Sequence, residues 1–399
     1  MNLIVDGNDD VLKALSTWSH ISPLLRLAVF TDDPELRMQL WSILEGVGEA
    51  AASQGGLSDV QISELCGYIQ KCIVDRNDNM AIASALLFGE NFVRGGSQDA
   101  SQLTSMVAAL AEEYHDNEIQ PAALRFIVSS SEGLGYTKEA VFWQRMLRWI
   151  DSEDEGMRAC AFLVLGNATR DDTAASDLID LLPGLLPHLR ASTPDSVQHA
   201  LLGLIRNLSV LLSNRPALYE ADIVNRLDEM GVWLPDRDRL GSVQGSAIVT
   251  IKNICRDNVA ASLTVLSALQ QSLLDLLLRT EDQALRWEAT RIFVNIIRSE
   301  AKAQEVWQYD SRVSEALADM LRTGSKHALL VNEAVIGLTL MVLKGRLNEV
   351  KNACEREDDS GASATKILGS IIQGETGMAQ EVRENVETFR GLLIGESRR

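Results

Sequence analysis

Four asparagines recur in the sequence at nearly equal spacing, and a side-chain amide both donates and accepts hydrogen bonds. Asn167, Asn207, Asn253 and Asn295 are separated by 40, 46 and 42 residues. Each ends an apolar run, as in AFLVLGNATRDD at 161–172. An unpaired amide in a core costs roughly 1–3 kcal/mol, so each asparagine needs a partner. That partner is either a neighbouring segment of the same chain or a bound molecule, and the sequence leaves both open.

The other residue types that perform chemistry do not form an active-site pattern. The five histidines are not spaced as HxxxH or HExxH, and no GxSxG motif occurs. The five cysteines are scattered without a CxxC pair, which indicates neither a zinc site nor a disulfide framework. We therefore expect reduced core thiols, no enzymatic activity, no cofactor and no bound metal.

The elements that position the asparagines follow from the same spacing. Related helices are expected at about 34–50, 80–96, 121–135, 157–172, 197–213, 243–258, 285–300, 331–346 and 378–393. A period near 42 residues is that of armadillo and HEAT repeats. The chain is 46% hydrophobic but only 5% aromatic, which also favours helices. The predicted fold is an all-α, armadillo/HEAT-type right-handed α-solenoid of about nine repeats. Helix starts are indicated by three pairs: Asp33 with Pro34, Thr193 with Pro194, and Thr280 with Gln283.

The charge is strongly acidic and uneven. The net charge is −19, and residues 1–160 hold 11 Lys/Arg against 24 Asp/Glu, whereas residues 161–399 hold 26 against 32. An acidic surface repels nucleic acid and attracts basic partners, although excess acid also simply keeps a long chain soluble. The longest apolar stretch noted, 328–343, contains Asn332 and Glu333 and is too short to span a membrane. With no signal-peptide pattern at the start, we expect a cytoplasmic protein, with the nucleus also open, and no integral membrane contact.

The asparagines end the helices that line the concave groove of an armadillo superhelix, where such proteins bind partners. Importin-like proteins also place a tryptophan four residues before each groove asparagine. The corresponding positions here are Leu163, Gly203, Val249 and Arg291. The sequence therefore disfavours a nuclear-import adaptor.

Three stretches, in order, carry a family resemblance. Residues 142–172, FWQRMLRWIDSEDEGMRACAFLVLGNATRDD, resemble armadillo-repeat small-GTPase GDP-dissociation stimulators, with matches from Gln144 and Arg145 through to Asp172. SVQHALLGLIRNLSV and SKHALLVNEAVIGLTL are similar to two further helices of that family. The resemblance extends over about 121–346. It implies one superhelix over 1–399, with divergent acidic repeats at 1–140, family-like repeats at 141–346 and a capping repeat at 347–399.

The resemblance implies a function without catalytic side chains. It predicts binding of Rho-, Rac- or Rap-type GTPases with polybasic, prenylatable tails, and stimulation of GDP release or chaperoning. An armadillo scaffold that binds a peptide partner without nucleotide exchange is the alternative. The predicted groove residues are Asn167, Arg170, Asp172, His199, Asn207, Asn332 and Glu333 from the resemblance, with Asn253 and Asn295 from the repeat.

Overall fold

The chain is an all-α solenoid in a computed structural model that describes residues 14–53, 56–75, 78–115, 118–303, 305–358, 361–374 and 377–395. Within these ranges there are no strands, and the only extended pairings are two isolated bridges, Gly95 with Ser97 and Glu357 with Ser363. The helices form two compact units. Unit 1 comprises Met1–Leu178 and Ser196–Leu204, and unit 2 comprises Ile179–Asp195 and Ile205–Arg399.

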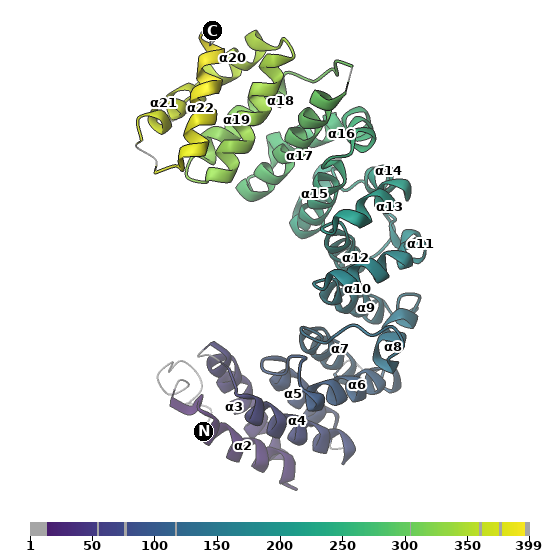
Figure 1. The fold of residues 1–399 in the computed structure, drawn as a ribbon. Coiled ribbons are helices and arrows are strands. Elements are labelled where there is room, and N and C mark those ends of the chain that lie inside the picture. Colours follow the sequence, from purple (N-terminus) through teal and green to yellow (C-terminus); the bar gives the residue numbers. More distant parts are fainter. Residues whose placement is uncertain are drawn as a thin grey trace. The chain divides into compact units, whose positions relative to one another are not determined.

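Unit 1 is built from two layers of stacked helices (Figure 1). The layer that carries the predicted asparagine, which we call the ladder layer, contains α3 (Pro34–Ser53), α5 (Asn79–Glu90), α7 (Ile119–Ser130) and α9 (Glu155–Ala168). The second layer contains α2 (Trp18–Phe30), α4 (Asp59–Val74), α6 (Gln98–Glu113) and α8 (Val141–Trp149). Each helix packs on the next of its own layer and on its partner in the other layer. The unit ends with α10 (Asp172–Leu178), while α12 (Asp195–Leu208) crosses the division between units.

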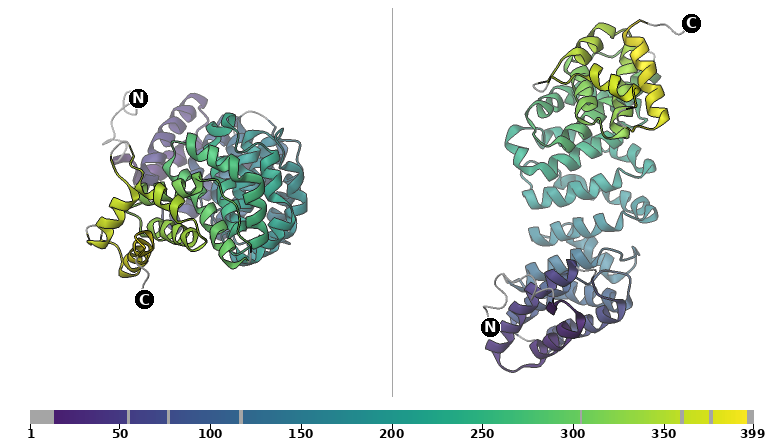
Figure 2. Two further views of the ribbon diagram at one scale, coloured as in Figure 1. Left: turned by 90° about the horizontal axis from the view of Figure 1, so that it is seen from above. Right: turned by 90° about the vertical axis from the view of Figure 1, so that its left-hand side faces the viewer.

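Unit 2 repeats this arrangement, as the further views show (Figure 2). Its ladder layer contains α15 (Gly241–Cys255), α17 (Gln283–Lys302), α19 (Ala328–Leu343) and α22 (Gln380–Leu393). Its second layer contains α14 (Ile223–Glu229), α16 (Val259–Arg279), α18 (Arg312–Thr323), α20 (Leu347–Glu355) and α21 (Ala364–Ile372). The shorter elements are η2 (Ile179–Leu181), α11 (Leu182–Leu185), η3 (Leu186–His188), η4 (Leu212–Asn214), α13 (Arg215–Glu220) and η5 (Pro235–Leu240).

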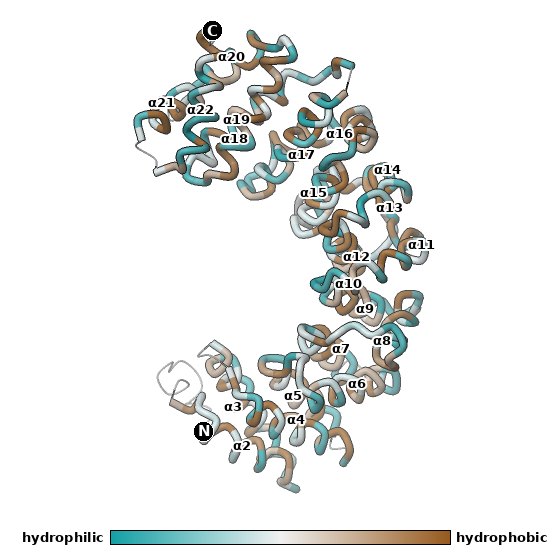
Figure 3. Tube along the Cα trace, viewed as in Figure 1, coloured by the Kyte–Doolittle hydropathy of each residue, from teal (hydrophilic) through white to brown (hydrophobic). Residues whose placement is uncertain are grey.

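All nine helices expected from the repeat are present, which confirms the predicted fold class. Each mixes apolar and polar residues along its length (Figure 3), as helices with one buried face require. Several ladder-layer helices bury one phenylalanine completely: Phe88, Phe126, Phe162, Phe293 and Phe389. Each such ring contributes roughly 1.5–3 kcal/mol through the apolar area it removes from water. The repeat therefore supplies both the helices and their core contacts.

One of the three predicted helix starts is correct. Asp33 Oδ1 accepts the backbone N–H groups of Glu35 and Leu36 at 3.0 and 3.3 Å, and α3 begins at Pro34. Thr193 is one position too early, because α12 begins at Asp195 and Pro194 occupies the N-cap position. Thr280 ends α16 instead, and Asp282 caps α17. Asp282 caps the helix in place of Thr280 because its carboxylate accepts the backbone N–H groups of both Ala284 and Leu285.

Close helix packing in unit 1 depends on Gly89 in α5. A Cβ at this position would lie 2.6 Å from Ile69 Cδ1 and 2.9 Å from Phe126 Cε2. The absence of a side chain therefore allows α5 to approach α4 and α7 at once.

Among the described helices, only α16 is long and apolar enough to cross a membrane by length and composition, and the sequence analysis did not single it out. Half of its apolar window is buried inside the fold. It packs against α14, α15, α17 and α18. A core helix of stacked repeats has the same composition, and these contacts account for its buried apolar residues.

Candidate functional site

The ladder asparagines hold neighbouring repeats together. In unit 1, Asn167 Nδ2 donates to the Val128 carbonyl at 3.2 Å and to Ser131 Oγ at 3.0 Å, which joins α9 to the end of α7. In unit 2, Asn253 Nδ2 donates to Ser209 Oγ at 3.0 Å. These contacts satisfy the amide N–H groups within the fold, so one of the two partners left open by the sequence is a neighbouring repeat.

The same pattern continues toward the C-terminus of unit 2. Asn295, which is 9% exposed, donates from Nδ2 to the Lys252 carbonyl at 2.9 Å and joins α17 to α15. Asn332 contacts the following helix of the layer and not the preceding one, because its Oδ1 accepts from Asn385 Nδ2 of α22 at 2.8 Å. Asn207 is half-buried in the last turn of α12.

The amide oxygens of the ladder are used differently from the nitrogens. Within the described part of the chain, Oδ1 of Asn167, Asn253 and Asn295 accepts no hydrogen bond. These three asparagines thus donate from Nδ2 to the stack and retain Oδ1 as an acceptor, whereas Oδ1 of Asn332 accepts from Asn385. A role for the ladder in partner binding stays a prediction, and it depends on that acceptor.

The three remaining unit 1 residues of the predicted groove are exposed. Arg170 follows α9 and pairs with Glu132 at 3.4 Å, with 64% of its side chain exposed. Asp172 is exposed at the first position of α10, and His199 is exposed on α12. Solvent access makes all three available to a partner.

Unit 2 carries a line of alternating charges across its ladder layer, which we call the charge row: Lys252 on α15, Glu288 and Arg291 on α17, and Glu333 on α19. Lys252 Nζ donates to Glu288 Oε2, and Arg291 Nη1 lies 2.5 Å from Glu288 Oε1. Arg291 Nε lies 2.5 Å from Glu333 Oε2. These four side chains are 13–30% exposed, so they are shielded but reachable from solvent.

Electrostatics within the charge row favour the ionised forms of Glu288 and Arg291. Burial raises the pKa of Glu288, but the hydrogen bond and charge of Lys252, with Arg291 beside them, outweigh burial and hold that pKa below 4.5. Burial lowers the pKa of Arg291, and its contacts with Glu333 and Glu288 more than reverse this. The charge row is therefore a prearranged set of two acidic and two basic groups.

Sequence reasoning predicted only Glu333 of this row. Lys252 directly precedes Asn253, and Arg291 lies four residues before Asn295. Glu288 precedes Arg291 by three residues, the spacing of neighbours on one helix face. Comparing the residues that flank each ladder asparagine would have found all four. Arg291 occupies the position where importin-like proteins carry tryptophan, and its partner here is a carboxylate.

Unit 1 contains a cleft between α3 and α5 that the sequence analysis did not predict. Its volume is about 640 Å³, and its lining includes the apolar Met38, Trp41 and Met80, the acidic Glu45 and Glu118, and the ion pair of Arg37 with Asp78. Half of each methionine is exposed, at 50% and 49%. The cleft therefore combines an apolar surface with carboxylates, as a ligand with an apolar chain and positive charge requires.

The described residues contain no group of three or more His, Cys, Asp or Glu side chains placed to hold a metal ion. All five cysteines are buried and none is joined in a disulfide, as expected for core thiols. Burial raises the pKa of Cys66 to about 11, and of Cys255 and Cys354 to about 12. These thiols stay protonated at neutral pH, which makes them poor nucleophiles.

The stacked helix layers and the asparagine ladder define this chain as an armadillo-type α-solenoid. Two solved structures are similar in fold: an engineered protein (TM-score 0.64, 17% identity, 98% of this chain and 93% of that one), and a structure from work on the cadherin–β-catenin interaction (TM-score 0.56, 12% identity, 96% and 79%). At these identities the likeness concerns the fold alone.

The predicted family resemblance is confirmed by two curated relatives from Xenopus laevis. The chain is 24% identical to Rap1 GTPase-GDP dissociation stimulator 1-B over 255 residues, which are 62% of this chain and 40% of that protein. Rap1 GTPase-GDP dissociation stimulator 1-A is 23% identical over 255 residues, again 62% of this chain and 40% of that protein. The chain thus matches less than half the length of these relatives. No family model matches it.

Proposed function

We propose that this chain binds small GTPases and stimulates release of their bound GDP without supplying a catalytic side chain. The observation that carries the proposal is the similarity to two Rap1 GTPase-GDP dissociation stimulators over 255 residues. Release of nucleotide requires only a partner that binds the opened GTPase better than the closed one. A preference of about 4 kcal/mol shifts that equilibrium roughly a thousandfold.

The polar ladder layer of unit 2 is the proposed contact surface for the GTPase. The charge row presents two carboxylates and two basic groups held in fixed positions, so a partner meets them with little loss of side-chain entropy. Lys252 and Arg291 suit acidic groups of the GTPase, and Glu288 and Glu333 suit basic ones. Ladder asparagines beside the row offer amide oxygens as acceptors.

We assign the basic tail of the GTPase, including prenylated tails, to unit 1. The excess of 24 acidic over 11 basic residues in 1–160 attracts a polybasic segment. The cleft with Met38, Trp41 and Met80 offers apolar surface for an attached hydrocarbon chain. Rho-, Rac- and Rap-type GTPases with such tails are the proposed partners, acting with this protein in the cytoplasm.

The first test is release of a fluorescent GDP analogue from a panel of Rho-, Rac- and Rap-type GTPases, each with its basic tail intact or deleted. Faster release that depends on the tail is the expected result. Binding without faster release would instead favour the alternative, an armadillo scaffold or chaperone without exchange activity. Absence of binding to every member would refute the proposal.

The role of the unit 1 cleft has its own test. A double variant, Met38→Lys with Met80→Lys, should weaken binding of a prenylated GTPase at least tenfold and leave the unprenylated form nearly unaffected. Val60→Lys is a matched control, because Val60 is 79% exposed on α4 and outside the cleft. Equal losses for prenylated and unprenylated forms would place the lipid elsewhere.

A further inference from the structure

A second cavity lies in unit 2 where α16, α17 and α18 meet the segment after α20, and it is rich in arginine. Its volume is about 330 Å³, and its lining pairs four arginines with four carboxylates: Arg286, Arg312, Arg322 and Arg356 with Glu315, Asp319, Glu357 and Asp358. No lysine lines it. Arginine in place of lysine is typical of sites that bind the oxygens of phosphate or carboxylate groups through paired N–H donors. In a chain with a net charge of −19, such a gathering of arginines calls for a physical explanation.

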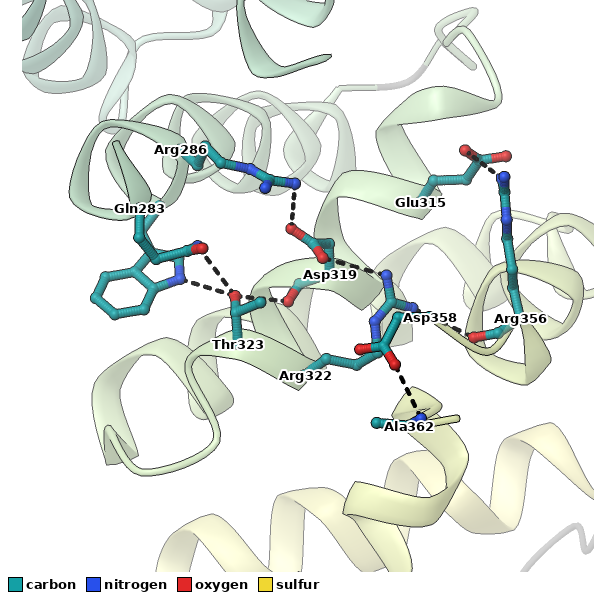
Figure 4. Close-up of polar contacts among 10 residues, drawn as sticks. Gln283, Arg286, Glu315, Asp319, Arg322, Thr323, Arg356, Asp358 and Ala362 are labelled. Atoms are coloured by element: carbon teal, nitrogen blue, oxygen red, sulfur yellow. Dashed lines mark hydrogen bonds and ion pairs between the residues drawn. The ribbon is translucent and has the colours of Figure 1, made fainter. Parts of the chain in front are cut away.

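Two of these arginines bracket one carboxylate (Figure 4). Arg286 Nη2 lies 2.7 Å from Asp319 Oδ2, and Arg322 Nη2 lies 3.2 Å from Asp319 Oδ1. Arg356 Nη1 pairs with Glu315 Oε2 at 3.0 Å, and the backbone carbonyl of Arg356 accepts from Arg322 Nη1 at 3.4 Å. Three guanidinium groups from three separate segments therefore converge on one small region.

Most of the N–H donors of these three arginines are unused. Within the described part of the chain, the guanidinium of Arg286 donates only through Nη2 and that of Arg356 only through Nη1. Arg322 Nε is buried and has no hydrogen-bond partner there. Arg312 differs, because Asp310, Asp275 and Gln271 already take its Nε, Nη1 and Nη2 atoms. An unpaired buried donor costs roughly 1–3 kcal/mol, and a ligand oxygen would recover that cost.

The internal carboxylates decide which anion fits. Asp319 and Glu315 already give the three arginines single-charge carboxylate partners, so an incoming carboxylate gains little by displacing them. A phosphate monoester carries a charge of about −1.5 to −2 and three acceptor oxygens. It can satisfy the unused donors of Arg286 and Arg322 together while Asp319 stays nearby. Competition from Asp319 sets the affinity in the modest range.

We propose that Arg286, Arg322 and Arg356 form a binding site for a phosphate monoester, and none of these three residues belongs to the charge row. The exposed Leu278, 72% accessible, lies in the lining of the same cavity and offers apolar contact to whatever carries the phosphate. The site does not depend on the GTPase proposal. A phosphorylated side chain and free phosphate share this chemistry, and the experiment separates them.

The test is isothermal titration calorimetry of the full chain with four probes: inorganic phosphate, N-acetyl-phosphoserine amide, N-acetyl-serine amide and N-acetyl-glutamate amide. Phosphate and phosphoserine should bind, and the serine and glutamate probes should not. Phosphoserine at least tenfold tighter than inorganic phosphate identifies a phosphorylated side chain as the ligand, whereas equal affinity identifies the free ion. Absence of binding heat for both phosphates at about 20 mM probe, which corresponds to a binding free energy weaker than about 2–3 kcal/mol, would overturn the proposal. Equal binding of the glutamate probe would overturn it as well.

Variants locate the binding. Arg356→Gln and Arg286→Gln should each weaken phosphoserine binding about fivefold or more. Arg125→Gln is the matched control, because Arg125 is 65% exposed and pairs with Glu90 at 3.0 Å, as Arg356 is 67% exposed and pairs with Glu315 at 3.0 Å. Asp319→Asn removes the internal competitor and should tighten binding. A loss of phosphoserine affinity in Asp319→Asn, with helical circular dichroism unchanged, would refute the competition on which the site depends.

Discussion

Arg291 joins two helices of the ladder layer through Glu333: its Nε lies 2.5 Å from Glu333 Oε2 and links α17 to α19. The same guanidinium holds Glu288 on its own helix through Nη1, at 2.5 Å. Side-chain exposures of 19% and 13% for Arg291 and Glu333 place the pair between a surface and a buried ion pair. Surface pairs contribute about 0–1 kcal/mol, and breaking a buried pair costs about 3–5 kcal/mol.

We therefore expect Arg291→Met to lower the free energy of unfolding by about 1–3 kcal/mol, since it leaves Glu333 without its cation and Glu288 with Lys252 alone. Urea denaturation measures the change. Arg125→Met, at an exposed pair in unit 1, should change stability by no more than about 0.5 kcal/mol. Adding Glu333→Leu to Arg291→Met should restore part of the loss. Indistinguishable stabilities for Arg291→Met and the wild type would show that the row is not coupled across the helices.

Acid should weaken unit 2 partly through Glu288. Its folded pKa lies below 4.5 because Lys252 and Arg291 outweigh its burial. A carboxylate with a lowered folded pKa stabilises fully above its unfolded pKa, and this contribution is lost as the pH falls through the folded value. Glu288→Gln should therefore reduce the loss of stability below about pH 4.5. Urea midpoints measured across the acid range test this, and an unchanged pH slope would contradict it.

Glu349 on α20 should behave oppositely. Burial raises its pKa above 4.5, more than the hydrogen bond from Ser314 and the charge of Arg346 lower it. The ionised side chain thus opposes folding at neutral pH, and the opposition fades as the pH falls toward its raised pKa. Glu349→Gln should increase stability at pH 7 and steepen the decline in acid. A decrease in stability at pH 7 would show that the carboxylate makes favourable contacts that outweigh its burial.

The ladder asparagines should differ in their tolerance of aspartate. Asn295→Asp sets a carboxylate oxygen against the Lys252 carbonyl, now 2.9 Å from Nδ2, in a site 9% exposed. Two acceptors facing each other there should cost about 2–4 kcal/mol. Asn253→Asp faces Ser209 Oγ at 3.0 Å, and that hydroxyl can turn to donate to the carboxylate in exchange for its bond to the Arg206 carbonyl, so about 1 kcal/mol is expected. Urea denaturation of both variants checks this, and equal costs would argue against the assigned contacts.

The sequence was sufficient for the fold because one short pattern repeats at nearly constant spacing. All nine expected helices exist, and their apolar faces follow directly from helical periodicity. Helix starts were less certain, since Asp282 competes with Thr280 and only the backbone path decides which residue caps. The proposed single superhelix over 1–399, with parts at 1–140, 141–346 and 347–399, stays a prediction.

The site was harder to predict, because its contacts join residues about 40 positions apart. Asn295 bonds a carbonyl of Lys252, and a carbonyl carries no sequence signal of its own. The two arginines around Asp319 come from different helices, α17 and α18. Residue types alone identified the asparagines as hydrogen-bonding groups. Only three-dimensional packing showed that the amide nitrogens of Asn167, Asn253 and Asn295 bond the neighbouring repeats, while the oxygen of Asn332 does so instead.

Exposed residues of the predicted groove allow partner binding to be separated from folding. A triple variant, Arg170→Ala with Asp172→Ala and His199→Ala, removes three exposed side chains of unit 1. Arg170 makes only a 3.4 Å pair with Glu132, so each change should alter the free energy of unfolding by about 0.5 kcal/mol or less. If these residues contact the GTPase, stimulated release of the fluorescent GDP analogue should fall at least tenfold at subsaturating protein.

The control for this triple variant is Asn167→Ala, which removes bonds to Val128 and Ser131 within the stack. It should lower stability by about 1–2 kcal/mol through lost hydrogen bonds. The triple variant should therefore lower activity at nearly unchanged stability, whereas Asn167→Ala should lower stability. Full GDP-release activity in the triple variant would remove Arg170, Asp172 and His199 from the partner surface. The charge row of unit 2 would then carry the contact with the GTPase alone. Its Glu333→Gln variant should show the loss of stimulated GDP release.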